Sequence, residues 1–275
     1  PDLIPEYFSF VRGVVDSSDL SLNISRELLQ HDRQLKLIAK NIEKKINSEL
    51  IKMQKDDREK YEKFFEEFGV QLKFGVYENF GMNKDKLQDL ILFYSSQEQK
   101  PVTLKEYVLR MKPDQDKIYY ATGETTGMID ALPQVDAVKD KGYEILYMTE
   151  AVDEFAVMAI AEYEGKGFVN ILSDNFDMGS EEEKEELKKI NEDAGDILEA
   201  IKEALGDRVL DVRFTNKLKN YPVCLTSEGE LSIEMEKTLN AMPTAEKVKA
   251  QVVLEINAEH PLAEKLKALK GNKEK

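Results

Sequence analysis

The stretch Lys117-Ile118-Tyr119-Tyr120-Ala121-Thr122-Gly123 decides the expected fold, because it joins a short apolar strand to a glycine turn. Two similar apolar runs follow at 143–149 and 168–173, and helical patterns at 126–140 and 151–163 separate the three. Pro133 is expected to break or kink the first of these helices. The β-α-β-α-β order predicts parallel strands with right-handed crossovers.

Helical periodicity dominates the residues before this unit. Apolar positions recur at helical spacing from Ser25, a plausible N-cap, to Met53. A second helix is expected over 56–68, with Gly69 as its stop and an aromatic face typical of core packing. Further helices are expected at 83–94 and at 103–112, where Thr103 to Glu106 form a capping box. A short helix is expected at 5–10 and a strand at 11–15. The aromatic face comprises Tyr61, Phe64, Phe65 and Phe68.

A smaller mixed region follows the parallel strands. A long helix is expected over 180–205, opened by a capping box from Ser180 to Glu183. Strands at 209–214, 221–226 and 250–256 and helices at 230–242 and from Pro261 complete the pattern. The sequence therefore predicts a mixed α/β fold: a helical segment, a small three-layer αβα unit with a parallel βαβαβ core, and a smaller mixed α/β C-terminal domain. The acidic run at 174–186 is the expected boundary.

The net charge and its distribution along the chain limit the classes of partner that the protein can bind. The 275 residues carry 54 acidic and 39 basic side chains, a net charge of −15. Residues 31–60 have net charge +3, whereas residues 144–203 have 18 acidic and 5 basic side chains and net charge −13. Nucleic-acid phosphates and anionic lipids both attract Lys and Arg. The net negative charge therefore excludes a general nucleic-acid binder and a protein that binds anionic membranes. No apolar run reaches the length of a membrane span.

Cysteine and histidine are scarce. Cys224 alone cannot form an internal disulfide, which fits a reducing, cytosolic setting. His31 and His260 lie far apart and lack cysteine partners, so a zinc site is not expected. The chain begins at Pro1 and shows no signal peptide, which indicates a processed chain or an excised fragment.

No common catalytic motif is present. The turn Gly123-Glu124-Thr125-Thr126-Gly127 matches neither dinucleotide nor P-loop fingerprint and is typical of a strand-to-helix turn. The serine-hydrolase, zinc-protease and calcium-loop patterns are absent as well. Cys224 has no neighbouring histidine and is expected to be a small buried apolar residue. A self-contained small-ligand or nucleotide-binding α/β enzyme, using the unit at 117–173, is kept as an alternative.

Two features suggest functional contacts. Arg26 lies at the first turn of a long helix, where a cation opposes the helix dipole. A salt bridge would explain it, and so would an anion outside the chain, such as the terminal phosphate of a nucleotide. The second feature is an apolar stripe at helical spacing that suits either core packing or an adaptable surface for apolar partners. It comprises Leu231, Met235, Leu239 and Met242.

Five segments resemble the heat-shock protein 90 family of chaperones. They are Val11–Gln30 (VRGVVDSSDLSLNISRELLQ), Ile118–Glu124 (IYYATGE), Glu144–Thr149 (EILYMT), Asp153–Val157 (DEFAV) and Glu255–Leu262 (EINAEHPL). They occur in the family's order over nearly the whole chain and resemble its bacterial branch. The resemblance assigns 1–178 to the C-terminal part of a middle domain: 1–30 is the end of a large αβα unit with the catalytic loop, 31–70 a helical connector and 71–178 a small αβα unit. Residues 179–275 resemble a C-terminal dimerisation-type domain without its last helices.

The resemblance also implies a mechanism, an ATP-driven clamp closure that acts on unfolded or partly folded client proteins. ATP with magnesium would be bound by an N-terminal ATPase domain outside this chain, which alone should be inactive and hold no cofactor. Arg26 matches the family's arginine that contacts the γ-phosphate, and Gln30 matches its loop glutamine. The stripe from Leu231 to Met242 matches a helix that contacts clients. The longer protein is expected to be a cytoplasmic homodimeric stress-response chaperone, and dimerisation of this chain is in doubt. A protein-interaction module without a catalytic role for Arg26 and Gln30 is a third hypothesis.

Overall fold

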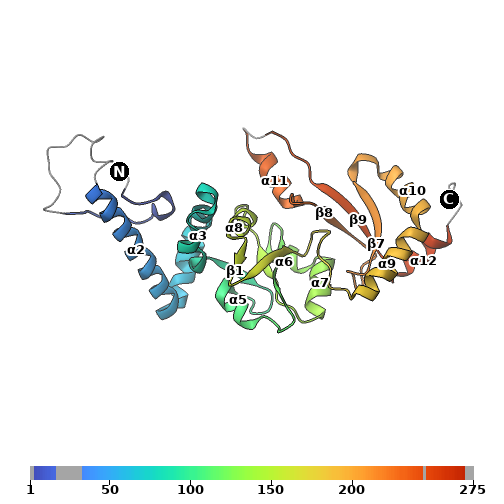
Figure 1. Cartoon of the computed structure of the whole chain (residues 1–275), viewed down its shortest axis with the longest axis horizontal. Coiled ribbons are helices and arrows are strands. Elements are labelled where there is room, and N and C mark those ends of the chain that lie inside the picture. The colour runs from blue at the N-terminus through green and yellow to red at the C-terminus, as the bar shows by residue number, and fades with distance from the viewer. Residues whose placement is uncertain (1–2, 17–32, 244–245, 270–275) are drawn as a thin grey trace. The chain divides into compact units, whose positions relative to one another are not determined.

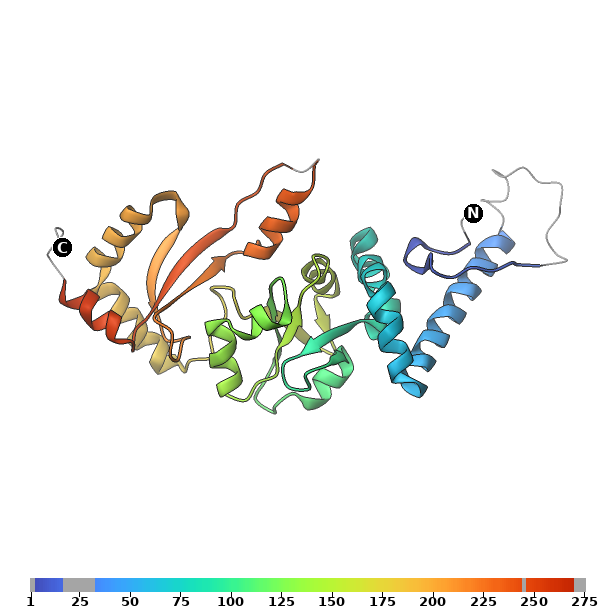
Figure 2. The same ribbon diagram turned by 180° about the vertical axis from the view of Figure 1, so that it is seen from behind.

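The computed structural model describes residues 3–16, 33–243 and 246–269 (Figures 1 and 2). The chain divides into two compact units. The first comprises residues 1–93, 101–109 and 155–164, and the second comprises 94–100, 110–154 and 165–275. Within the described residues, the longest apolar helical stretches fall short of what a membrane crossing requires.

Two long helices dominate the first unit. Helices α2 (Arg33–Asp56) and α3 (Arg58–Gly81) meet at Asp57 and diverge from there (Figure 1), and a short 3₁₀ turn, η1 (Glu6–Phe8), packs on α3. Asp57 separates the two helices, because its carboxylate accepts a hydrogen bond from the Lys60 amide at 3.2 Å and so caps α3. The aromatic face of α3 packs inward as predicted: Tyr61 is fully buried, and the Phe10 ring lies 5.0 Å from that of Phe64.

The predicted helix stop at Gly69 is wrong. Helix α3 continues through Gly69, where an added β-carbon would lie 2.6 Å from the Phe65 ring. This glycine therefore permits close packing and does not supply a left-handed cap. Helical geometry ends later, where Asn79 and Phe80 have φ angles of 53° and 56°. Sequence reasoning took a packing glycine for a terminating one.

Two other local predictions are wrong as well. The expected helix at 83–94 is a short helix, α4 (Lys84–Leu87), a 3₁₀ turn, η2 (Gln88–Leu90), and a strand, β1 (Leu92–Ser95). Residues 90–93 are all buried, and a short continuous apolar run fits a buried strand as well as a helix. The described residues 11–16 contain no strand, and Val14 is 96% exposed.

The first sheet has a parallel centre, as predicted. Its six strands lie in the order β2-β1-β4-β3-β6-β5, and β3 runs parallel to β4 and β6. Strand β1 runs antiparallel to β4. The sequence did not predict this pairing, because a helix was expected at 83–94, where β1 lies. Residues 118–122 are all buried, so both faces of β3 are covered. The strands not yet bounded are β2 (Pro101–Thr103), β3 (Lys117–Thr122), β4 (Leu146–Met148), β5 (Glu162–Tyr163) and β6 (Lys166–Asn170).

The helices next to these strands follow their sequence signals. Helix α5 (Leu104–Arg110) has the predicted capping box, since Thr103 and Glu106 bond each other's backbone amides at 3.1 and 2.7 Å. Pro133 divides the predicted helix at 126–140 into α6 (Thr126–Asp130) and α7 (Pro133–Asp140). The segment expected over 151–163 forms α8 (Asp153–Ile160).

The second sheet has the order β7-β9-β8, with β9 parallel to β7 and antiparallel to β8. The helix predicted over 180–205 breaks at Ala194 into two helices that both contact β7, and the predicted capping box of Ser180 and Glu183 is present. The mixed α/β class is confirmed, whereas the division at 178/179 stays a prediction. The elements are β7 (Asp211–Thr215), β8 (Val223–Glu228), β9 (Gln251–Asn257), α9 (Glu181–Asp193), α10 (Gly195–Leu205), η3 (Gly206–Arg208), α11 (Ile233–Ala241) and α12 (Pro261–Ala268).

Candidate functional site

The two predicted phosphate-contacting residues, Arg26 and Gln30, lie outside the described residues. Their assignment therefore stays a prediction from the motif at 11–30. The other predicted contact residues lie on or beside α11, which the structure describes. The candidate site therefore comprises α11 and the neighbouring residues that line a groove with it.

Helix α11 presents the predicted apolar stripe unevenly. Met235 is 7% exposed and belongs to the core, Leu231 and Leu239 are half-buried, and Met242 is 46% exposed. Ser232 caps the helix, because its hydroxyl oxygen accepts a hydrogen bond from the Met235 amide at 3.0 Å. The stripe thus combines an inward anchor at Met235 with side chains accessible to a partner.

A buried carboxylate holds the start of α11. Glu154, 5% exposed, accepts hydrogen bonds from the Asn170 amide at 3.1 Å, the Tyr120 hydroxyl at 3.4 Å and the Ser232 hydroxyl. Burial raises the pKa of Glu154 above its ordinary value, the three hydrogen bonds oppose that shift, and the Glu234 charge adds to it. These contacts tie α11 to strands β3 and β6.

An apolar groove lies where β3 and β6 end. Strand β3 pairs with β4 on one side and with β6 on the other, so the connection from β4 to β6 crosses over β3. The ends of β3 and β6 are therefore the switch point of a doubly wound sheet, where ligands commonly bind. The cavity measures about 350 Å³, and β8 and α11 line its other side. We call it the switch-point groove; its apolar lining includes Met128, Leu132, Leu172, Leu225 and Ile233.

Local chemistry explains the walls of the switch-point groove. A β-carbon on Gly123 would lie 2.8 Å from Ile129, so this glycine allows α6 to approach β3. Thr125 caps α6 by accepting from the Met128 amide at 3.2 Å. The Gln134 amide donates to the Leu225 carbonyl at 3.0 Å and joins α7 to β8. Among the expected turn glycines, Gly123 is therefore required for space.

The polar groups of the switch-point groove do not suit a phosphate. The lining contains two carboxylates, Glu124 and Glu234, and one ammonium group, Lys237. Lys237 is bound to Glu234 at 2.7 Å and lies 3.9 Å from Glu124. A smaller cavity of about 130 Å³ beside it is lined by these two carboxylates and by Glu150 and Glu154. A triphosphate would meet net negative charge here, so these residues do not fit a nucleotide.

A second buried carboxylate stabilises the sheet around Cys224. Glu255, 1% exposed, bonds Arg213 at 2.9 Å and Lys217 at 3.3 Å. Cys224 is buried as predicted, and burial together with the Glu255 charge raises the pKa of its thiol to about 12. The thiol therefore stays protonated near neutral pH and is not an activated nucleophile.

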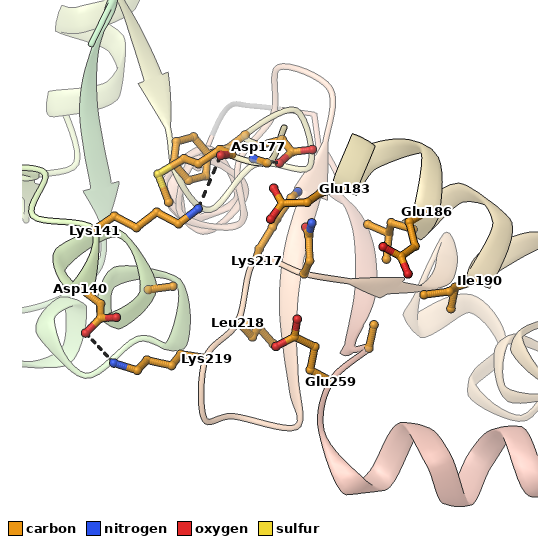
Figure 3. A pocket seen from close by; sticks show the side chains of 17 residues that line it. Asp140, Lys141, Asp177, Glu183, Glu186, Ile190, Lys217, Leu218, Lys219 and Glu259 are labelled. Atoms are coloured by element: carbon orange, nitrogen blue, oxygen red, sulfur yellow. Dashed lines mark hydrogen bonds and ion pairs between the residues drawn. The ribbon is translucent and has the colours of Figure 1, made fainter. Parts of the chain in front are cut away.

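A third cavity, of about 400 Å³, is lined by α7, by α9 and by the loops that follow β7 and β9 (Figure 3). Two bonds span it: Lys219 pairs with Asp140 at 2.5 Å, and Lys141 donates to the Met178 carbonyl at 3.5 Å. Its lysines are thus engaged by the protein, and its remaining charges are carboxylates such as Glu183 and Glu186. Within the described part of the chain, no group of three His, Cys, Asp or Glu side chains could hold a metal ion.

Sequence reasoning located α11 but missed the groove beside it. Met128 and Leu225 are 55% and 50% exposed and line it, yet they lie almost 100 positions apart. The available signal was the strand order, since a parallel βαβαβ unit predicts a crevice at its switch point. Glu154 lies in a segment quoted for the resemblance, although its partner Ser232 lies 78 positions away.

The comparisons with known proteins agree over the whole chain. The family model described as Hsp90 protein matches residues 1–275. The chaperone protein HtpG of Clostridium perfringens is 58% identical over 275 residues, which are all of this chain and 44% of that protein. HtpG of Clostridium acetobutylicum is 57% identical over the same span and with the same coverage. HtpG of Oceanobacillus iheyensis is 56% identical over 272 residues, 98% of this chain and 43% of that protein. The chain thus spans less than half the length of the curated relatives it matches.

Proposed function

The chain belongs to the Hsp90 protein family, and on that premise we propose that it is part of an ATP-dependent molecular chaperone that assists the folding and remodelling of client proteins. The observation that carries this proposal is the family match over all 275 residues. The relatives' names support it, since each is a chaperone protein HtpG. The resemblance found in the five sequence segments is thereby confirmed at the level of the family.

In the proposed division of labour, ATP and magnesium bind to an N-terminal ATPase domain that is joined to this chain in the longer protein. Arg26 then orients and stabilises the γ-phosphate, with Gln30 beside it, and hydrolysis releases the closed clamp. The acidic lining of the switch-point groove supports this division, because the described residues there repel a triphosphate. The same lining argues against the alternative of a self-contained nucleotide-binding enzyme.

Client contact is proposed for α11. Met235 anchors the helix, while Leu231, Leu239 and Met242 offer apolar surface to a partner. Methionine adapts to partners of different shape because its side chain is unbranched and flexible. In the longer protein we propose two such surfaces, one on each subunit of a cytoplasmic homodimer.

The catalytic part of the proposal is tested in a chimera that joins this chain to the whole part of Clostridium perfringens HtpG that it does not cover. Arg26→Ala should lower ATP turnover at least about tenfold, since an arginine on a transferred phosphate commonly contributes ~10³-fold or more. Arg33→Ala, in the same stretch of chain, is the matched control and should leave turnover unchanged. Unchanged turnover in a folded Arg26→Ala chimera would leave the chain with an interaction role alone.

The client part is tested with Leu239→Asp combined with Met242→Asp in the same chimera. These side chains are at least partly accessible, so the fold should survive and suppression of client aggregation should weaken. Leu109→Asp is the control, because Leu109 is 75% exposed and lies on α5. Equal suppression by all three proteins would mean that α11 has a structural role only.

A further inference from the structure

The switch-point groove has the properties of a binding site for an apolar side chain. Its volume of about 350 Å³ lies in the range of ligand pockets. Met128 and Leu225 line it and keep about half of their surface exposed, 55% and 50%. An apolar group placed between them would be removed from water at both sides, which is favourable in proportion to the area buried.

The rim of the groove is acidic. Glu124, with a side chain 66% exposed, and Glu234 outnumber Lys237, which both carboxylates already engage. Glu228, the last residue of β8, and Glu230, in the turn before α11, are both exposed. A ligand that reaches the apolar lining therefore passes a surface of net negative charge, which attracts cations and repels anions.

We propose that the switch-point groove binds a bulky apolar residue of an unfolded client segment whose neighbouring residues are Lys or Arg. The apolar lining supplies most of the affinity, and the acidic rim selects the flanking residues. The inference rests on the proposed chaperone function and names the substrate class of the surface that includes α11. It also predicts which unfolded segments are rejected, namely apolar residues flanked by Asp or Glu.

Four labelled peptides test the selection by fluorescence anisotropy with the whole chain. Three share a central Leu-Phe pair, flanked by Lys, Ser or Glu, and the fourth has Lys flanks around a Ser-Ser pair. The Lys-flanked apolar peptide should bind about tenfold more tightly than the Glu-flanked one at low ionic strength, a difference of about 1.4 kcal/mol. Salt should reduce this preference, and the Ser-Ser peptide should not bind. Equal binding of the Lys- and Glu-flanked peptides would overturn the proposed selection.

Variants locate the binding. Met128→Asp and Leu225→Asp should each lower the affinity for the Lys-flanked apolar peptide at least about tenfold, whereas Leu109→Asp should leave this affinity unchanged. Both positions are half exposed, and an unchanged melting curve by circular dichroism checks that each variant folds. If both folded variants bind the peptide like the wild type, the groove is not the site.

A charge reversal separates the rim from general electrostatics. Glu124→Lys should abolish most of the preference for Lys flanks, while Glu182→Lys, on the exposed first turn of α9, makes the same change in net charge and should not. If the two variants behave alike, the preference comes from the net charge of −15 and the rim plays no part. Aggregation suppression by the chimera is an independent readout: suppression retained in a folded Met128→Asp chimera would refute the groove assignment and leave the chaperone proposal standing.

Discussion

Replacing Ser232 by alanine should release the start of α11. The substitution removes the N-cap hydrogen bond to the Met235 amide, which contributes about 1 kcal/mol in typical helices. It also removes one of three donors from Glu154, a carboxylate that is 5% exposed, and an unsatisfied buried acceptor costs about 1–3 kcal/mol. Together these two changes should destabilise the docked state of α11, relative to the undocked state, by about 2–4 kcal/mol.

Native-state hydrogen exchange measures this loss locally, which matters because the chain has two compact units and global unfolding need not be two-state. The amides of α11 should exchange at least about 30-fold faster in Ser232→Ala than in the wild type, because 1.4 kcal/mol corresponds to a factor of ten. Ser180→Ala is the matched control: Ser180 caps α9 in an exposed position without a buried carboxylate, so α9 should lose only about 1 kcal/mol. Equal losses at both helices would refute a special role for Glu154.

The pH dependence supplies a second check on Glu154. Because burial raises the pKa of Glu154 in the folded state, protonation of this group favours the native state. Its contribution to the free energy of unfolding is fully present below the unfolded-state pKa near 4.5 and is lost as pH rises through the folded-state pKa. Glu154→Gln removes this titration, so the stability difference between wild type and variant should change over that window and be constant at higher pH. A difference that is independent of pH would show that the carboxyl titrates alike in both states.

Three further outcomes follow from the packing. Gly75→Ala should destabilise the first unit by about 1–3 kcal/mol in urea unfolding, because the added β-carbon would lie 2.5 Å from Tyr7, whereas Gly127→Ala, with open space around it, should be neutral or mildly stabilising. Glu255→Ala should cost at least about 3 kcal/mol, because two cations lose a buried partner; a loss below about 1 kcal/mol would contradict the assigned burial. Cys224, with a thiol pKa of about 12, should react with iodoacetamide at pH 8 about 10²-fold or more slowly in the native than in the denatured chain, and equal rates would refute that pKa.

The fold was predictable wherever a signal was local. The strand at Lys117–Thr122 was predicted to the residue, because an apolar run followed by a glycine has few alternatives. Caps at Thr103 and Ser180 were predicted because the capping box is a short-range motif. The errors arose where a local signal has more than one meaning: Gly69 lies inside α3 and leaves room for the Phe65 ring one turn earlier, although a glycine is also a common helix stop.

The candidate site was predictable only in its elements. Periodicity identified α11 and its stripe, but the direction of each side chain depends on what the helix packs against, and Met235 turned out to be core. The groove beside α11 joins α6, α7, β8 and α11, and the Gln134 bond to the Leu225 carbonyl bridges 91 positions. Such a cavity follows from topology, since the switch point of a parallel sheet can be located once the strand order is known.

The groove and the buried carboxylate beside it are thermodynamically linked. Helix α11 supplies part of the groove lining through Ile233 and Glu234, and the Ser232–Glu154 hydrogen bond holds the same end of the helix. A peptide that binds only when α11 is docked therefore stabilises the docked state by RT ln(1 + [L]/Kd), about 2.7 kcal/mol at a hundredfold excess over Kd. Conversely, Ser232→Ala should raise the apparent Kd of the peptide by the factor 1 + Kopen, where Kopen is the ratio of undocked to docked α11 in the variant without peptide. Slower α11 exchange on addition of the Lys-flanked peptide, with the effect lost in Met128→Asp, is the expected sign of this coupling; exchange that ignores a saturating peptide would show that the groove binds independently of the helix.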